Sequence, residues 1–73
     1  MKIFEIVHNG GLYRAEIFEY PLYKGCFNLS VHYIDDRGFL RPEFNKYYMS
    51  EKSALIKLKK YFKGETVEWT RVG

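Results

Sequence analysis

The dipeptide Asn9-Gly10 lies between two largely apolar segments, residues 3–7 and 12–18. Asn-Gly is the strongest short signal for a two-residue hairpin loop, because both loop positions of a type I′ turn need a positive φ. The sequence therefore predicts that the chain opens with a β-hairpin.

The register of this hairpin follows from its charges. With Asn9-Gly10 as the loop, Glu5 lies opposite Arg14, whereas a loop one residue later would place Glu5 opposite Glu16. Opposite charges on facing strands stabilise a hairpin and like charges destabilise it, so we prefer the first register. It places five residues on one face, which we take as the core side: Phe4, Ile6, Tyr13, Ala15 and Ile17.

Residues 26–34 alternate cleanly, which is typical of an antiparallel strand with one buried face. The apolar side holds Phe27, Leu29, Val31 and Tyr33, and the outward side holds Asn28, Ser30 and His32. Pro21 and Gly25 predict a loop or a bend over residues 20–25, before this strand.

A turn is expected after this strand, because residues 35–38 read Asp-Asp-Arg-Gly. The chain then returns through residues 39–49. Pro42 lies within this return strand and has no N–H to donate to a neighbour. We therefore expect an edge strand or a bulge at Pro42.

A helix is predicted over residues 51–62. Ser50 is a favourable N-cap, Glu51 suits the first turn, and Gly64 is a plausible stop after the last turn. One apolar stripe runs along the helix at helical spacing: Ala54, Leu55, Leu58, Tyr61 and Phe62. The opposite stripe, expected to face water, holds Lys52, Ile56, Lys59 and Lys63. Residues 66–72 read as a last strand, with Val67 and Trp69 on one face.

These elements predict one α+β domain over residues 1–73. Its order is β-β-β-β-α-β, with a small antiparallel sheet packed against one amphipathic helix near the C-terminus. A domain of this size buries only about 60% of the surface that its unfolded chain exposes. Aromatic rings, which bury about 150–250 Å² each, allow such a thin core to form.

Basic side chains are concentrated in residues 37–63, where eight Lys and Arg face two Glu. Residues 1–36 carry three basic against five acidic side chains. Cys26 is the sole cysteine, so no intramolecular disulfide can form. No signal-like or membrane-spanning apolar run is present. We therefore expect a cytoplasmic protein without a membrane segment.

Catalytic and metal-binding signatures are not found in the sequence. His8, His32 and Cys26 are too far apart to form a zinc motif, and the Asp35-Asp36 pair is better explained by a turn than by a cation site. No nucleotide-binding or hydrolase motif occurs. We expect no enzymatic activity and no cofactor.

The favoured hypothesis is a small binding or regulatory module, of adaptor or inhibitor type, that acts through protein–protein contact. The predicted contact residues combine basic, aromatic and aliphatic side chains: Arg37, Arg41, Lys46, Tyr47, Lys52, Ile56, Lys59 and Lys63. Tyr20, Tyr23, Phe44 and Tyr48 are further aromatic residues near this basic region. The sequence also permits self-association through an edge strand.

The alternative is a nucleic-acid-binding protein that uses the basic segment 37–63. Interleaved aromatic and basic residues can stack unpaired bases and bind phosphates. Residues 27–62 also resemble the DNA-binding arm of phage-type integrases, which has a strand, a turn, a second strand and a capped helix in this order. The resemblance rests on Tyr33, Asp35, Gly38, Lys46, Tyr48, Ser50 and Ala54. The outward face of residues 28–32 lacks the Arg or Lys that would read bases, so we do not assign the chain to that family.

Overall fold

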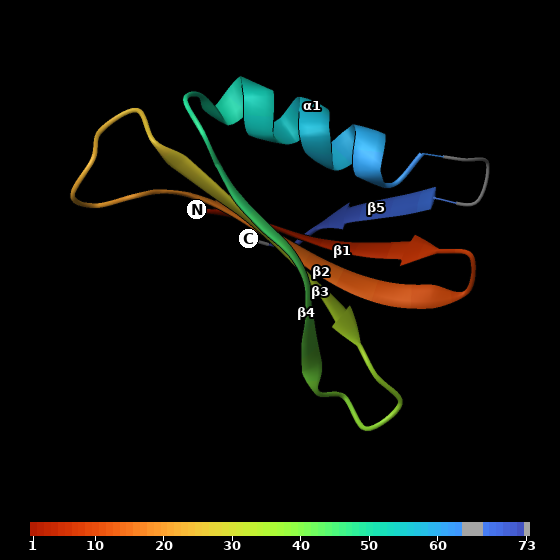
Figure 1. Ribbon diagram of the computed structural model, residues 1–73. Coiled ribbons are helices and arrows are strands. Elements are labelled where there is room, and N and C mark those ends of the chain that lie inside the picture. The colour runs from red at the N-terminus through yellow and green to blue at the C-terminus, as the bar shows by residue number, and fades with distance from the viewer. Residues whose placement is uncertain (64–66, 73) are drawn as a thin grey trace.

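The computed structural model describes residues 1–63 and 67–72, in which five strands form one antiparallel sheet with a helix on one face (Figure 1). The elements in chain order are β1 (Lys2–His8), β2 (Gly11–Glu19), β3 (Phe27–Ile34), β4 (Leu40–Tyr48), α1 (Glu51–Tyr61) and β5 (Val67–Arg71). The spatial order of the strands is β4-β3-β2-β1-β5, so β1 lies between the second and the last strand of the chain. The predicted α+β class and element order are confirmed.

The β1–β2 hairpin has the predicted loop and register. Asn9 and Gly10 have φ angles of 51° and 79°, as a type I′ turn requires. Glu5 lies opposite Arg14, and Val7 lies opposite Leu12. The hairpin therefore places alternate residues of both strands on the same face of the sheet.

Strand β4 forms one edge of the sheet, and its pairing with β3 is irregular at Pro42. Val31 pairs with Phe44 but His32 pairs with Pro42, so Glu43 is an extra residue without a partner on β3. This is a β-bulge, and it accommodates a residue that cannot donate to the ladder. Both expectations for Pro42, an edge and a bulge, are confirmed.

Helix α1 begins at the predicted cap. The Ser50 hydroxyl accepts a hydrogen bond from the Ser53 backbone N–H at 3.1 Å, and Lys2 of β1 forms an ion pair with Glu51 in the first turn. At the other end, the Phe62 backbone N–H donates to the Leu58 carbonyl. The stop predicted at Gly64 lies outside the described residues.

The core lies between α1 and the face of the sheet formed by β1, β2 and β3. Its buried side chains are Ile6, Ala15, Ile17, Leu29, Val31, Ala54, Leu58 and Phe62. Partly buried rings extend this cluster, among them Phe4, Tyr13, Phe27, Phe44 and Tyr48. The predicted sidedness of the helix is confirmed for most positions, because Ala54, Leu58 and Phe62 are buried and Lys52, Ile56 and Lys59 are exposed on the outer side of α1. Tyr61, which was predicted on the apolar stripe, is 37% exposed, and Lys63 is exposed but follows the end of α1.

The opposite face of the sheet, here called the open face, is not covered by any described element (Figure 1). The molecule is flat, with extents of 36 × 26 × 19 Å. Its accessible surface of 5255 Å² exceeds the roughly 4,800 Å² expected for a compact chain of 8.8 kDa. Val7, Leu12, Ile34 and Leu40 form a cross-strand aliphatic row near one end of this face.

Asn28 lies on the open face as its strand position predicts, but it is only 3% exposed, which the sequence did not predict. Its cross-strand neighbours are Phe18 on β2 and Tyr47 on β4, two large rings that flank it on both sides. The Asn28 amide donates to the Asn45 side chain at 2.5 Å and accepts from the Ser30 hydroxyl at 2.9 Å. These hydrogen bonds satisfy the buried amide.

Candidate functional site

Three tyrosines and one cysteine converge on a hollow of about 390 Å³, here called the tyrosine pocket: Tyr20, Tyr23, Cys26 and Tyr47. The rings of Tyr20 and Tyr23 stack with their centroids 5.5 Å apart. The ring of Tyr47 meets that of Tyr20 edge-on at 5.8 Å, with an angle of 85° between the planes. The pocket is therefore lined by aromatic rings, two of which are stacked while the third lies nearly perpendicular to Tyr20.

The loop between β2 and β3 is held in shape by its own hydrogen bonds. The Tyr20 backbone N–H donates to the Cys26 carbonyl at 2.7 Å, which closes the loop at its base. Inside the loop, the Tyr23 backbone N–H donates to the Tyr20 carbonyl at 3.2 Å, and the Cys26 backbone N–H donates to the Tyr23 carbonyl at 3.1 Å. The Glu19 carboxylate accepts from the Gly25 backbone N–H at 2.9 Å. The backbone of three of the four lining residues is thus held in place before a ligand binds.

The fourth lining residue comes from the edge strand. Tyr47 pairs with Asn28 and therefore points to the open face, away from α1. Tyr47 is 53% exposed and Tyr23 is 66% exposed, even though both contribute to the pocket. Leu22 in the loop and Met49 after β4 are also largely exposed at this end of the sheet. The pocket thus belongs to an apolar end of the molecule.

The outer side of α1 and the residue after its C-cap present a second exposed surface, here called the helix stripe: Lys52, Ile56 and Lys59 of α1, and Lys63 beyond Phe62. Ile56 is 45% exposed. No ion pair or hydrogen bond involves these three lysine side chains within the described part of the chain. The stripe is therefore a positively charged surface with one aliphatic residue at its centre.

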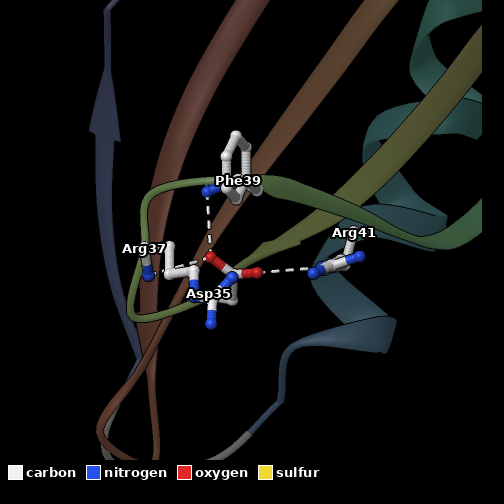
Figure 2. Close-up of polar contacts among 4 residues, drawn as sticks. All are labelled: Asp35, Arg37, Phe39 and Arg41. Atoms are coloured by element: carbon white, nitrogen blue, oxygen red, sulfur yellow. Dashed lines mark hydrogen bonds and ion pairs between the residues drawn. The ribbon is translucent and has the colours of Figure 1, made fainter.

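Arg37 and Arg41 lie in a third place, at the turn between β3 and β4 (Figure 2). The Asp35 carboxylate accepts hydrogen bonds from the backbone N–H groups of Arg37 at 3.0 Å and Phe39 at 2.9 Å. Its second oxygen accepts from Arg41 Nε at 2.9 Å. The Phe39 N–H and the Arg41 guanidinium are the main reasons why the pKa of Asp35 lies below 3.8. The Arg41 side chain thus contributes to the turn.

The eight predicted contact residues therefore do not form one continuous patch. Four belong to the helix stripe, two to the β3–β4 turn, and Tyr47 to the tyrosine pocket on the opposite face. Lys46 lies on the helix side of β4, with its Nζ 5.9 Å from the centre of the Tyr48 ring. A single flat partner cannot contact Tyr47 and Ile56 at once, because these side chains project from opposite faces of the molecule.

Tyr20, Tyr23 and Cys26 line the pocket but are not among the contact residues that the sequence predicts. The missing information is the pairing of β3 with β4, which brings Tyr47 beside the loop. One local pattern could have indicated this site. Tyr23 lies between Pro21 and Gly25, in a loop that is too short to bury its ring. An aromatic residue in a short, closed loop is a candidate contact in its own right.

No group of three or more His, Cys, Asp or Glu side chains able to hold a metal ion occurs among the described residues. Burial raises the pKa of Tyr48 and of Tyr61, and both phenols lie on the helix side of the sheet, away from the pocket. Within the same residues, no helix is long and apolar enough to cross a membrane.

Comparison of the chain with protein families, with curated proteins and with solved structures finds no match.

Proposed function

We propose that this protein is a small, non-enzymatic binding module of adaptor or inhibitor type that acts by protein–protein contact centred on the tyrosine pocket. The observation that carries the proposal is the convergence of three tyrosines on one open hollow. Tyrosine is enriched among the residues that dominate binding energy at interfaces, because it buries a large ring and keeps a hydroxyl for a partner. The lone Cys26, without a disulfide partner, is consistent with action in the cytoplasm.

The surroundings of the pocket also support a protein partner. Leu22, Tyr23, Tyr47 and Met49 are exposed large apolar residues at the same end of the sheet. A central aromatic anchor surrounded by further apolar surface is the usual anatomy of a protein interface. The stabilised loop would lose little conformational entropy on binding, which favours affinity.

The test uses the fact that two predicted contacts lie on opposite faces. Wild-type protein, a Tyr47→Ala variant and an Ile56→Glu variant are used as baits in quantitative affinity purification from the native host. We expect the Tyr47→Ala variant to lose the specific partner and the Ile56→Glu variant to retain it. The proposal is wrong if Tyr47→Ala and a Tyr23→Ala variant both recover the same partners as the wild type.

A second candidate function, nucleic-acid binding, is favoured by one observation: the helix stripe carries lysines without acidic partners among the described residues. These lysines and the tyrosine pocket lie on opposite faces, so one strand cannot easily stack on the rings while its phosphates contact the stripe. This candidate predicts that binding falls steeply with salt. A Lys52→Ala, Lys59→Ala double variant should reduce the salt dependence, and absence of binding to DNA and RNA at low salt would eliminate the candidate.

Self-association through an edge strand remains a separate proposal. The Pro42 bulge interrupts the free edge of β4. Within this strand, regular backbone for pairing with a second copy is therefore limited to Phe44 to Tyr48. The molar mass in solution, measured by light scattering over a range of concentrations, tests this directly. A constant monomer mass would exclude it.

A further inference from the structure

The hydroxyl groups of the tyrosine pocket are available to a ligand. Tyr20, Tyr23 and Tyr47 form ring contacts, but none of their hydroxyls makes a hydrogen bond within the described part of the chain. A phenol O–H donates readily, and its partner in a complex is typically a carbonyl or carboxylate oxygen. The lining therefore combines flat apolar surfaces with three unused donors.

Asn45 adds a fourth donor beside the pocket. Its side-chain Oδ1 accepts from Asn28, whose own oxygen is occupied by Ser30, so the Nδ2 group of Asn45 is left for other partners. Asn45 and Tyr47 are two residues apart on the open face, about 7 Å along the strand. The hydrogen bond from buried Asn28 thus orients the exposed Asn45 amide, whose donor lies near the aromatic lining.

The pocket carries no formal charge. Its lining consists of tyrosine and cysteine, and the adjacent residues Glu19, at the end of β2, and Lys24, in the loop, have opposite charges. Farther along the open face, Arg14 is paired with Glu16 at 3.1 Å. A cationic ligand would find no lining carboxylate, and an anionic ligand would find no lining lysine or arginine. The electrostatic complement of this surface is a neutral chain that is rich in hydrogen-bond acceptors.

We propose that the tyrosine pocket binds an extended, proline-rich segment of the partner protein. In the polyproline II conformation every backbone carbonyl is free to accept a hydrogen bond, and a proline has no N–H that would need an acceptor in the lining. Proline rings pack on aromatic surfaces, and the stiff segment loses little entropy on docking. This inference rests on the proposed function and names the chemistry of the partner.

The size of the pocket agrees with this ligand. A hollow of about 390 Å³ is at the lower end of the roughly 300–1,000 Å³ found for small-molecule pockets. Because it is open, it suits the ring of one or two residues from a chain that continues past it, rather than an enclosed metabolite. The open face provides room for the continuation on the side of the pocket that leads away from this end of the sheet.

The test is a titration of isotope-labelled protein with a capped, neutral oligoproline of about ten residues, roughly three turns of the polyproline helix. Amide chemical shifts should change saturably at Tyr20, Tyr23, Cys26 and Tyr47. A Gly-Ser peptide of equal length, an arginine-rich peptide and a single-stranded oligothymidine serve as competing ligand chemistries. We expect none of them to bind the pocket.

Variants separate the rings from the hydroxyls. Tyr47→Ala and, independently, Tyr23→Ala should abolish oligoproline binding, whereas Tyr47→Phe should weaken it about fivefold, the loss of one hydrogen bond of about 1 kcal/mol. The matched control is Phe39→Ala, which removes an exposed ring from the β3–β4 turn and should bind like the wild type. Preserved amide dispersion in each variant shows that the fold is intact.

Three outcomes would overturn the inference: no saturable shifts with oligoproline, shifts confined to residues outside the pocket, or preferential binding of the arginine-rich peptide or the oligothymidine. The proposed function fails separately. If oligoproline does not bind but Tyr47→Ala still loses the protein partner that Ile56→Glu retains, only the ligand chemistry is wrong. If Tyr47→Ala and Tyr23→Ala both retain the protein partner, the protein-contact function centred on the pocket is wrong.

Discussion

Tyr47 and Tyr48 are adjacent in the chain, yet their side chains lie on opposite faces of the sheet. Tyr47 points to the open face and lines the tyrosine pocket. Tyr48 packs against the core on the helix side, and its hydroxyl is buried without a hydrogen-bond partner among the described residues. One pair of neighbours therefore separates a binding role from a packing role, and substitutions at the two positions should have different effects.

The Tyr48→Phe substitution should leave the free energy of unfolding unchanged or raise it by up to about 1 kcal/mol. The reason is that a buried, unpartnered hydroxyl costs desolvation energy and returns no hydrogen bond. Urea denaturation at neutral pH measures the change. The matched control, Tyr47→Phe, removes an exposed hydroxyl and should not alter stability.

Tyr48 should also influence alkaline stability. Burial raises the pKa of this phenol above its ordinary value of 10.0, so the folded state favours the protonated form. The stability that the folded state gains by keeping this phenol protonated is therefore complete below about pH 10, and it is lost as the pH rises through the raised pKa. The Tyr48→Phe variant should lose less thermal stability than the wild type between about pH 9 and pH 12. Equal losses in both proteins would contradict this account.

Asp35→Ala should destabilise the protein at neutral pH, because one carboxylate organises the whole β3–β4 turn. The folded-state pKa of Asp35 is lowered, so its contribution is present above about pH 4 and disappears as the pH falls through that lowered pKa. Melting temperatures of wild type and variant should differ at pH 7 and converge near pH 2. The neighbouring Asp36→Ala variant should match the wild type at both values.

Gly10→Ala should cost about 1 kcal/mol of stability, because Gly10 has a φ of 79° that a side chain with a Cβ adopts only with strain. The space around Gly10 is open, so no clash contributes to this effect. Chemical denaturation gives the difference. Gly10→Asn should cost less than Gly10→Ala, because asparagine tolerates a positive φ better than alanine, and an equal or larger cost would contradict the turn assignment.

Leu58→Ala should destabilise the protein by about 2–5 kcal/mol, since Leu58 is fully buried between α1 and the sheet. A domain of this length has a total stability of only about 4–11 kcal/mol, so this substitution should remove a large share of it. Circular dichroism with urea titration measures the loss. Ile56→Ala, on the outer side of the same helix, should change stability by less than about 0.5 kcal/mol.

Much of this fold was predictable from local patterns. The Asn9-Gly10 loop and the facing charges of Glu5 and Arg14 were sufficient for the register of the first hairpin, because both act between neighbouring residues. The cap at Ser50 and the two stripes of α1 were likewise predictable, since helical spacing determines which side chains share a face. Pro42 indicated the bulge because it cannot donate to the ladder.

The candidate site was not predictable to the same degree. The pocket requires Tyr47 of β4 beside Tyr20 of the β2–β3 loop, and that proximity depends on the alignment of three strands and on the extra residue Glu43. For the same reason the sequence does not reveal that Tyr47 and Ile56, both predicted contact residues, lie on opposite faces. The burial of Asn28 has the same origin, because its flanking rings come from two different strands.

The position of β1 has a consequence for synthesis on the ribosome. β1 is synthesised before β5, but one of its edges pairs with β5, in which Val67 lies opposite His8. Until those residues leave the exit tunnel, the backbone of that edge has no partner and is open to a strand from another nascent chain. A chain stalled before Val67 should therefore be the form most in need of a chaperone.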